Sequence, residues 1–233
     1  SAFRGCSRLE NMVLPDGVKS IGDFAFSSCK NLKIINIPNG IESIGFCTFQ
    51  RCANLESITL PNSIKTIGYY AFEGCSSLES INIPNSVESI GNHAFASCTK
   101  IKSITLSKNV NSIGVGAFNL CVNLETINIP AGVTDIGDYA FNACRSLKSI
   151  KIPDSVKNIG KDAFNGCPNL KITIGYQAYL RLKNKIPKNL IHTIIMPEDC
   201  LTIEKGAFRN LSGLEFIDIP RNVKNIADST FYG

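Results

Sequence analysis

IGDFAFSSC, residues 21–29, is a short apolar phrase that contains one glycine and ends in a cysteine. The phrase returns as IGYYAFEGC at 67–75, IGNHAFASC at 90–98, IGVGAFNLC at 113–121, IGDYAFNAC at 136–144 and IGKDAFNGC at 159–167. Aligned on these copies, the chain shows a 23-residue period and the longer pattern CxxLxxIxIPxxVxxIGxxAFxxC. A fixed period of this length is typical of proteins built from stacked repeats.

Two residue types recur in every copy, and each forms a column with a spacing of 23. The columns are Cys6, Cys29, Cys52, Cys75, Cys98, Cys121, Cys144 and Cys167, and Phe3, Phe26, Phe49, Phe72, Phe95, Phe118, Phe141 and Phe164. With 44% hydrophobic and 18% charged residues, the chain can bury a continuous core. We therefore expect equivalent side chains of successive copies to lie directly above one another.

Each copy contains a predicted strand. Leu147, Ile150 and Ile152 alternate with polar residues, and Pro153 ends the stretch because proline cannot donate to a sheet ladder. Identical spacing in the next copy returns the chain to the same edge in the same direction, so the strands should be parallel. We count ten such strands.

The rest of the unit is the return path. Gly160 is expected to permit a turn, and Ala163, Phe164 and Cys167 would fall on one face of a single helical turn. The prediction is an α/β, right-handed solenoid of about ten 23-residue repeats, each with one parallel strand and a short helical turn. Residues 1–233 form a single domain that starts and ends in mid-repeat.

One rung departs from the pattern at residues 175–190, where GYQAYLRLKNKIPKN replaces the expected IGxxAF. Tyr176 and Tyr179 are candidates to replace the missing phenylalanine. The chain has no acidic residue between Asp162 and Glu198, and the excess charge of +5 comes from this region. The basic residues there are Lys171, Arg181, Lys183, Lys185 and Lys188. They form either a patch for an acidic partner, a sulfated glycan or a phosphate-rich surface, or solvated lysines on an exposed amphipathic helix.

The ten cysteines invite readings as metal ligands, disulfides or buried thiols. Zinc sites need convergent ligands, whereas the column supplies one cysteine per rung. Disulfides between neighbouring rungs are disfavoured because the side chains would point in parallel, and Leu211 fills one column position. Buried thiols are the favoured reading. We expect Cys200 to be buried as well, and Cys47, at a variable position, to be the reactive cysteine.

Catalytic chemistry has little support in the sequence. The two histidines, His93 and His192, are expected to be solvated surface residues, and no nucleophile, base and acid arrangement or carboxylate pair stands out. The glycines recur as corners of the repeat rather than as a phosphate-binding loop. We expect no catalytic residues, no metal and no cofactor.

The outward positions of the strands form a broad face, which is where repeat proteins tend to bind partners. In the middle of the chain these positions are almost all Ser, Thr or Asn. The candidate ligand-binding residues are Ser57, Thr59, Ser80, Asn82, Ser103, Thr105, Thr126, Asn128, Ser149 and Lys151. The alternative is that these polar groups only keep a flat sheet soluble.

The repeat LxxIxIPxxVxxIGxxAFxxC resembles the BspA-like leucine-rich repeats of bacterial and protozoan surface proteins, and the likeness covers essentially the whole chain. The resemblance implies a leucine-rich-repeat solenoid, an extracellular or cell-surface location, and a non-enzymatic adhesin or antigen that binds a host or extracellular-matrix protein or glycan. The alternative is a structural spacer that displays another domain. Nucleic acid is not an expected partner, and no apolar run is long enough for direct membrane insertion.

Overall fold

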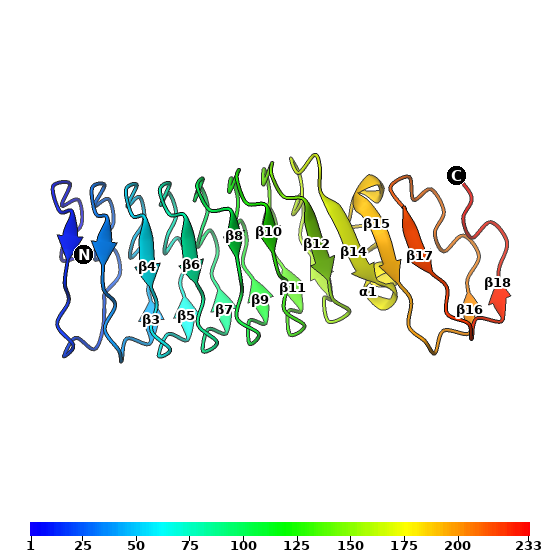
Figure 1. Cartoon of the computed structure of the whole chain (residues 1–233), viewed down its shortest axis with the longest axis horizontal. Helices are drawn as coiled ribbons and strands as arrows, with labels where there is room; N and C mark the ends of the chain where they lie inside the picture. Colours follow the sequence, from blue (N-terminus) through cyan, green and yellow to red (C-terminus); the bar gives the residue numbers. More distant parts are fainter.

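The computed structural model describes residues 1–233, which form one elongated coil of stacked turns (Figure 1). The coil is a parallel-strand β-solenoid with about 9 turns of about 23 residues. The prediction of about ten repeats is close but high, because ten successive strands enclose only nine turns. Only 4% of the chain is helical, so the helical half of the predicted α/β class is wrong.

One row of strands is the predicted one, and its outward side is called the strand face below. Neighbouring strands are parallel and shifted by 23 residues, as in the pairing of Ser57 with Ser80 and of Ser103 with Thr126. Isolated bridges join β2 to β4 and β6 to β8, which makes the row continuous. The ten strands are β1 (Asn11–Met12), β2 (Ile34–Ile35), β4 (Ser57–Thr59), β6 (Ser80–Asn82), β8 (Ser103–Ile104), β10 (Thr126–Ile127), β12 (Ser149–Ile152), β14 (Lys171–Gly175), β15 (Ile191–Ile195) and β17 (Phe216–Asp218).

A second row of short strands follows the proline turn, so the prediction of a single strand per repeat is wrong. These strands have only two residues each and alternate one exposed or half-buried residue with one isoleucine, a stretch too short to identify from its pattern. They pair in parallel with the equivalent residues of neighbouring turns. They are β3 (Ser43–Ile44), β5 (Thr66–Ile67), β7 (Ser89–Ile90), β9 (Ser112–Ile113), β11 (Asp135–Ile136), β13 (Asn158–Ile159), β16 (Thr202–Ile203) and β18 (Asn225–Ile226).

The segment GxxAFxxC, called the arc below, is a chain of tight turns and not the predicted helical turn. In one arc the N–H of Glu73 donates to the carbonyl of Tyr70, three residues earlier, at 3.2 Å. The N–H of Phe72 instead donates to the carbonyl of Ala94 in the next turn, at 2.8 Å. The N–H groups alternate in this way along the arc. A helix would direct all of them to carbonyls four residues earlier, so the links between turns replace it.

Two columns of each arc have left-handed backbone, with φ between 52° and 74°. The first column is Phe24, Cys47, Tyr70, His93, Gly116, Tyr139 and Asp162, and the second is Gly5, Ser28, Arg51, Gly74, Ser97, Leu120, Ala143 and Gly166. Most of these residues are not glycine, although this conformation is unfavourable for a residue with a Cβ atom. The conformation also holds at Asp162 and Gly166, whose N–H groups make no bond to the next turn, so it does not depend on those hydrogen bonds alone.

The recurrent glycine of IG serves a different purpose from the turn that we expected. Its φ is not left-handed, but its backbone lies against the preceding turn. A Cβ atom at Gly137 would lie 2.5 Å from the nitrogen of Val115 and 2.7 Å from the carbonyl carbon of Gly114. Glycine at this position thus allows the close approach of successive turns.

The predicted columns form the core. Phe72, Phe95 and Phe118 are fully buried, and their rings stack with centroids 5.3 and 5.6 Å apart. The same stacking runs from Phe3 to Phe164 at spacings of 5.3 to 5.7 Å. From Phe26 onward this ladder belongs to a single cluster of 66 buried residues, which reaches to Leu211 and forms one continuous core.

The divergent rung is the only place where a helix replaces the arc. Helix α1 (Tyr176–Leu182) is followed by the 3-10 turn η1 (Lys188–Leu190), and neither is long and apolar enough to cross a lipid bilayer. Tyr176 and Tyr179 are buried and contact Phe208 with ring centroids 5.8 and 5.6 Å away, which confirms that they replace the missing phenylalanine. The paired strands accommodate the rung with a bulge between β14 and β15.

The divergent rung also interrupts the backbone bonds between arcs. The carbonyl of Ala207 accepts the hydroxyl hydrogen of Tyr179 at 2.6 Å, and the carbonyl of Arg209 accepts from the ammonium of Lys188 at 3.3 Å. These side chains stand in for the N–H groups of a regular arc. On the other side of the rung, the N–H groups of Asp162, Phe164 and Gly166 have no hydrogen-bond partner in the protein. The rung therefore completes one neighbouring arc and leaves the other incomplete.

Candidate functional site

All ten candidate ligand-binding residues are exposed on the strand face, in two rows that run across the strands. The strand pairing places Ser103, Thr126 and Ser149 side by side in one row, and Thr59, Asn82 and Thr105 in the other. Strands in such a row are spaced ~4.8 Å apart. The face is therefore a regular lattice of small polar groups.

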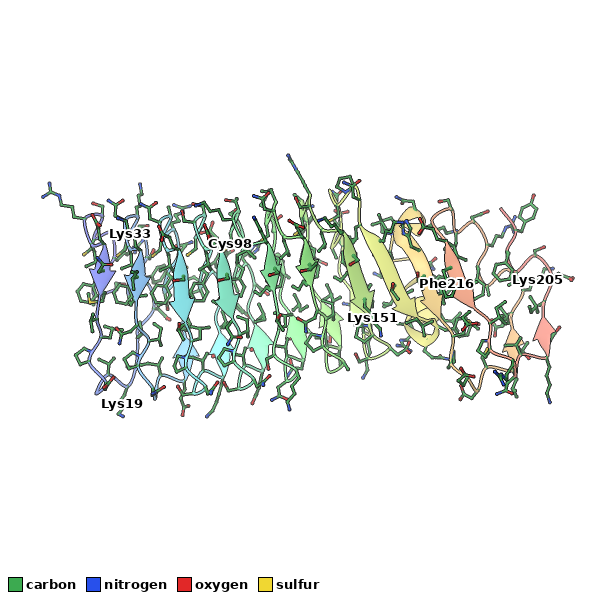
Figure 2. All side chains as sticks on the ribbon, viewed as in Figure 1. Lys19, Lys33, Cys98, Lys151, Lys205 and Phe216 are labelled. Atoms are coloured by element: carbon green, nitrogen blue, oxygen red, sulfur yellow. The ribbon has the colours of Figure 1, made fainter.

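The hydroxyl groups of this lattice have no hydrogen-bond partner in the protein, and this holds for Ser57, Thr59, Ser80, Ser103, Thr105, Thr126 and Ser149. Each hydroxyl can donate one hydrogen and accept others. A ligand with both donors and acceptors, such as a sugar or a peptide backbone, matches this chemistry. Lys151 lies on β12 and the exposed Phe216 lies on β17, in the same row of strands (Figure 2).

Asn128 has a different role from its neighbours. Its side-chain oxygen accepts from the N–H of Leu106 at 2.7 Å, and its amide nitrogen donates to the carbonyl of the same residue at 3.3 Å. Asn36 makes the same pair of bonds with Leu14. These amides bind the backbone of the preceding turn, so Asn128 is less available to a ligand than the hydroxyls. The repeated sequence NIP does not by itself predict these bonds, because Asn82 stands in the same sequence and makes none.

Charged residues beside the strand face are paired across turns. Lys33 and Glu10 lie 2.9 Å apart, and Lys148 pairs with Glu125 in the same way. The hydrogen bond from Lys148 lowers the pKa of Glu125, and the bond to Glu10 raises the pKa of Lys33. All four side chains are in solvent, so these pairs contribute little to stability. They leave the edge of the face nearly neutral.

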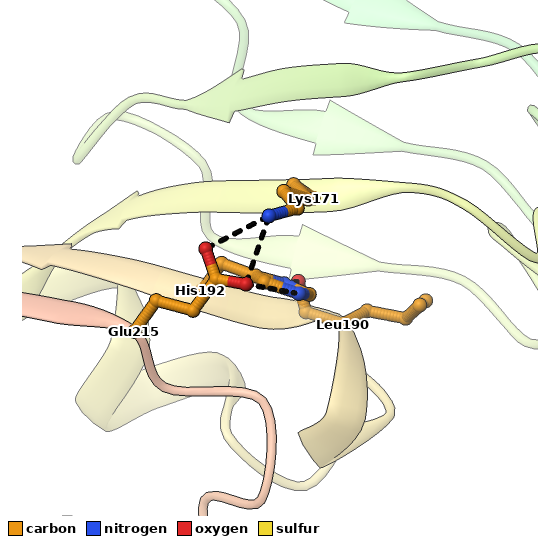
Figure 3. Close-up of polar contacts among 4 residues, drawn as sticks. All are labelled: Lys171, Leu190, His192 and Glu215. Atoms are coloured by element: carbon orange, nitrogen blue, oxygen red, sulfur yellow. Dashed lines mark hydrogen bonds and ion pairs between the residues drawn. The ribbon is translucent and has the colours of Figure 1, made fainter.

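The five candidate basic residues do not form one patch. Lys171 lies on the strand face, where its ammonium binds both carboxylate oxygens of Glu215 at 2.8 Å and lowers the pKa of that carboxyl (Figure 3). Arg181 donates to the backbone carbonyls of Asp154 and Val156. The sequence could not show either contact, because both partners come from other turns.

Lys183, Lys185 and Lys188 have no salt-bridge partner and line two different cavities. Lys185 lies at a cavity that also contains Asp162 and Phe164, with a volume of about 140 Å³. Lys183 and Lys188 line a cavity of about 200 Å³ with Arg209, a residue that the sequence analysis did not single out. The search for basic residues within the divergent rung missed Arg209 because it belongs to the next turn.

We expected the two histidines to be solvated surface residues, but both are half-buried. His93 stacks on Tyr70 with ring centroids 4.9 Å apart. His192 forms a 2.9 Å hydrogen bond with the carbonyl of Leu190, and its Nε2 lies 3.8 Å from Glu215 (Figure 3). Neither histidine lies beside a nucleophile, and no group of three or more metal-ligating side chains is present.

The cysteine column consists of free, hydrogen-bonded thiols. Seven of the eight sulfurs, all except that of Cys6, donate to the carbonyl of the phenylalanine 26 positions earlier, as Cys98 does to Phe72 at 3.2 Å. Burial raises the pKa of Cys52 and of Cys121 to about 12, which keeps the thiols protonated and unreactive near neutral pH. Seven of the eight column cysteines are buried, and all ten cysteines of the chain are free thiols.

Three cysteines differ from the expected exposure. Cys6 is exposed, and Cys200 is only half-buried. Cys47, the expected reactive cysteine, is buried, so that prediction is wrong. The ring of its neighbour Phe46 contacts Phe24 and Tyr70, the residues one turn before and after Cys47 in its column.

Comparison with solved structures agrees with this architecture. A leucine-rich repeat protein from Bacteroides ovatus is 31% identical with a TM-score of 0.59, over 98% of this chain and 65% of that one. The leucine-rich repeat protein of T. pallidum is 28% identical with a TM-score of 0.66, over 80% of this chain and 86% of that one. A leucine-rich cell surface protein from Faecalibacterium prausnitzii is 27% identical with a TM-score of 0.51, over 74% of this chain and 61% of that one.

The present chain thus spans less than two thirds of the Bacteroides and Faecalibacterium proteins. No curated protein matches it. The family model described as the BspA type leucine-rich repeat region matches residues 1–124, 66–184 and 111–233, with 6 copies. Together these matches cover the whole sequence, and the chain belongs to the BspA-type leucine-rich repeat family.

Proposed function

We propose that this chain is a binding module displayed outside the cell, and that it recognises a host or extracellular-matrix protein or glycan through its strand face. The observation that carries the proposal is the lattice of unbonded hydroxyls on the exposed side of β4 to β12. Repeats of this family are typically binding or structural modules, and no catalytic relative is named among the similar structures. A relative described as a cell surface protein supports the location.

The composition of the face indicates the kind of contact it makes. Its exposed groups are short, so a ligand can approach the sheet closely along several turns. The neighbouring lysines are largely paired with glutamates, which reduces long-range charge attraction. Affinity would come from many modest hydrogen bonds, each worth ~1 kcal/mol, rather than from one deep pocket.

A matrix-protein and glycan array probed with the fragment tests the proposal. The face variant Ser80→Glu with Thr105→Glu places two carboxylates in the middle of the lattice. The control variant Ser43→Glu with Thr66→Glu introduces the same charge at exposed positions of the second row of strands. We expect the wild type and the control to bind the same array member, and the face variant to lose about tenfold in affinity, because two desolvated carboxylates without partners oppose binding.

The alternative role is a structural spacer without a ligand of its own. Asn128 and the paired lysines favour it, because part of the polar surface already bonds within the protein. Absence of any binding to the array by the wild type would support the spacer. Equal binding by the face variant and the control would place the ligand elsewhere on the molecule.

A further inference from the structure

We infer that the cavity between helix α1 and the arc at residues 206–210 binds a sulfate or phosphate group carried on a glycan. Its lining consists of Tyr179, Lys183, Asn184, Lys188, Gly206, Ala207, Arg209 and Asn210. Three of these residues are cationic and none is acidic. The cavity lies off the strand face, so this inference goes beyond the function proposed above.

The three cations have no carboxylate partner. None of the salt bridges of the protein includes Lys183, Lys188 or Arg209. Lysines near the strand face, such as Lys65 with Glu42, differ in this respect. An anion that entered the cavity would therefore not have to displace an existing partner.

The cavity also offers many hydrogen-bond donors and few free acceptors. The ammonium of Lys188 donates one hydrogen to the carbonyl of Arg209, which leaves two of its three N–H donors for a ligand. The side-chain amides of Asn184 and Asn210 make no hydrogen bond within the protein. The carbonyl of Ala207 is occupied by the hydroxyl of Tyr179. Oxygen atoms that only accept hydrogen bonds match such a lining.

The position of Arg209 favours a tetrahedral oxyanion. Its guanidinium carbon lies 5.1 Å from the centre of the Tyr232 ring, a cation–π contact that restrains the group. The five N–H donors of a guanidinium lie in its plane, so stacking on a ring leaves them free to form the paired bonds that sulfate and phosphate oxygens accept.

The size of the cavity limits the part of the ligand that enters. At about 200 Å³ it is smaller than the ~300–1,000 Å³ of pockets that enclose a complete small-molecule ligand. A single anionic group fits, while the rest of the glycan stays outside. Sulfate esters and phosphate monoesters of sugars share this chemistry.

The two sources are separated by titration with N-acetylglucosamine 6-sulfate, N-acetylglucosamine 6-phosphate and neutral N-acetylglucosamine. Binding is followed by the NMR shifts of the side-chain amides of Asn184 and Asn210. We expect the charged sugars to shift these signals and the neutral sugar to leave them unchanged. The tighter of the two charged sugars identifies the anion.

Variants test whether the cavity is the site. Lys183→Gln with Arg209→Gln removes two cavity charges, and Lys157→Gln with Lys161→Gln removes two exposed charges from a regular turn. We expect the cavity variant to bind the charged sugar about tenfold more weakly and the control to bind within about twofold of the wild type. Arg209→Lys keeps the charge without the paired donors. Its affinity for the charged sugar should lie between that of the cavity variant and that of the control.

The dispersion of the same spectra shows that each variant is folded. Equal weakening by the cavity variant and the control would mean that only net charge matters, and would overturn the inference. Absence of any shift in the wild type would overturn it as well. Neither outcome bears on the strand face, because the two surfaces share no residue.

Discussion

The arcs at residues 137–144 and 160–167 have the same backbone conformation, yet they differ in the hydrogen-bond partners of their N–H groups. In the first, the N–H groups of Tyr139, Phe141 and Ala143 donate to carbonyls of the next turn at 2.7 to 2.9 Å. In the second, the equivalent N–H groups meet the divergent rung and find no partner. The conformation of an arc thus persists without a following arc, while its bonding does not.

The comparison separates two sources of order in a repeat protein. A regular turn is held by columns that repeat at every level, so losing one contact leaves the same contact in the turns above and below. The divergent rung depends on single side chains, Tyr179 and Lys188, which each complete one carbonyl. Variants in the two regions should therefore differ in how much free energy of unfolding they lose and in how many turns they affect.

The largest effect is expected in the middle of the phenylalanine ladder. Phe118 is fully buried and stacks on both neighbours, at 5.6 and 5.5 Å. Phe118→Ala should lower the free energy of unfolding by ~3–5 kcal/mol, because it removes buried apolar surface and leaves a cavity. Urea denaturation measures the loss, with the exposed substitution Asn111→Ala as control. A loss under 1 kcal/mol would mean that the stacked rings do not support the regular turns.

Alkaline pH should destabilise the regular turns through the cysteine column. Burial raises the pKa of Cys52 and Cys121 to about 12, above the ordinary value of 9.0. The stabilising contribution is therefore complete below pH ~9 and is lost as pH rises toward ~12, because the unfolded state releases the proton first. Between pH ~9 and ~12, each such thiol should lower the free energy of unfolding by ~1.4 kcal/mol per pH unit.

Denaturation midpoints at several pH values between 8 and 11 measure this slope. Cys121→Val removes one thiol from the column and should make the slope shallower. The substitution has a natural precedent in Leu211, which is buried at the equivalent position beyond the divergent rung. An unchanged slope in the variant would contradict the assignment to the column.

The close approach of turns should make the recurrent glycine intolerant of a side chain. At Gly137 an added Cβ would meet backbone atoms of the preceding turn at 2.5 Å, whereas at Gly132 the nearest atom would be 3.5 Å away. Gly137→Ala should cost ~1–3 kcal/mol through overpacking, and Gly132→Ala should be nearly neutral. Thermal unfolding of the two variants makes the comparison, and equal midpoints would show that the spacing of turns adjusts freely.

At the divergent rung, a smaller effect is expected from a single hydroxyl. Tyr179→Phe keeps the ring against Phe208 but removes the hydrogen bond to the carbonyl of Ala207. We expect a loss of ~1–3 kcal/mol, because a buried carbonyl is left without a partner. Tyr139→Phe is the control, since the hydroxyl of Tyr139 makes no hydrogen bond within the protein. Equal stability of the two variants would mean that another group satisfies the carbonyl.

Hydrogen exchange should reveal the incomplete arc without any substitution. The amides of Phe141 and Ala143 are bonded to the next turn, and those of Phe164 and Gly166 are not. We expect the second pair to exchange faster under native conditions, because protection of an amide depends on its hydrogen bond. Equal protection would show that the divergent rung closes over the arc in solution.

The sequence predicted the columns well because a fixed period places equivalent residues together whatever the details of each turn. The rows on the strand face, the stacked phenylalanines and the replacement by Tyr176 and Tyr179 all follow from position alone. The helical turn was a wrong prediction because Ala163, Phe164 and Cys167 have a spacing that suits both a helix and a chain of tight turns. The choice between them depends on bonds to another turn.

The candidate site was only partly predictable for the same reason. Exposure of Ser80 or Thr105 follows from strand alternation, whereas the partners of Asn128 and Lys171 lie one or two turns away. The cavity with Arg209 combines residues of the divergent rung with residues of the turn that follows it. No period relates such residues, so only the folded chain brings them together.

The left-handed columns carry a consequence for protein engineering. Residues as different as Tyr139, Ala143 and Asp162 adopt this conformation, so most of these positions accept varied side chains at the cost of backbone strain. Gly116 is an exception, because an added Cβ would lie 2.4 Å from the ring of His93. The chain already contains residues suited to this conformation, with glycine at 74 and 166 and with Asp162 and Asn210. An artificial array that used asparagine at both columns of every unit would relieve that strain while preserving a varied outer surface elsewhere.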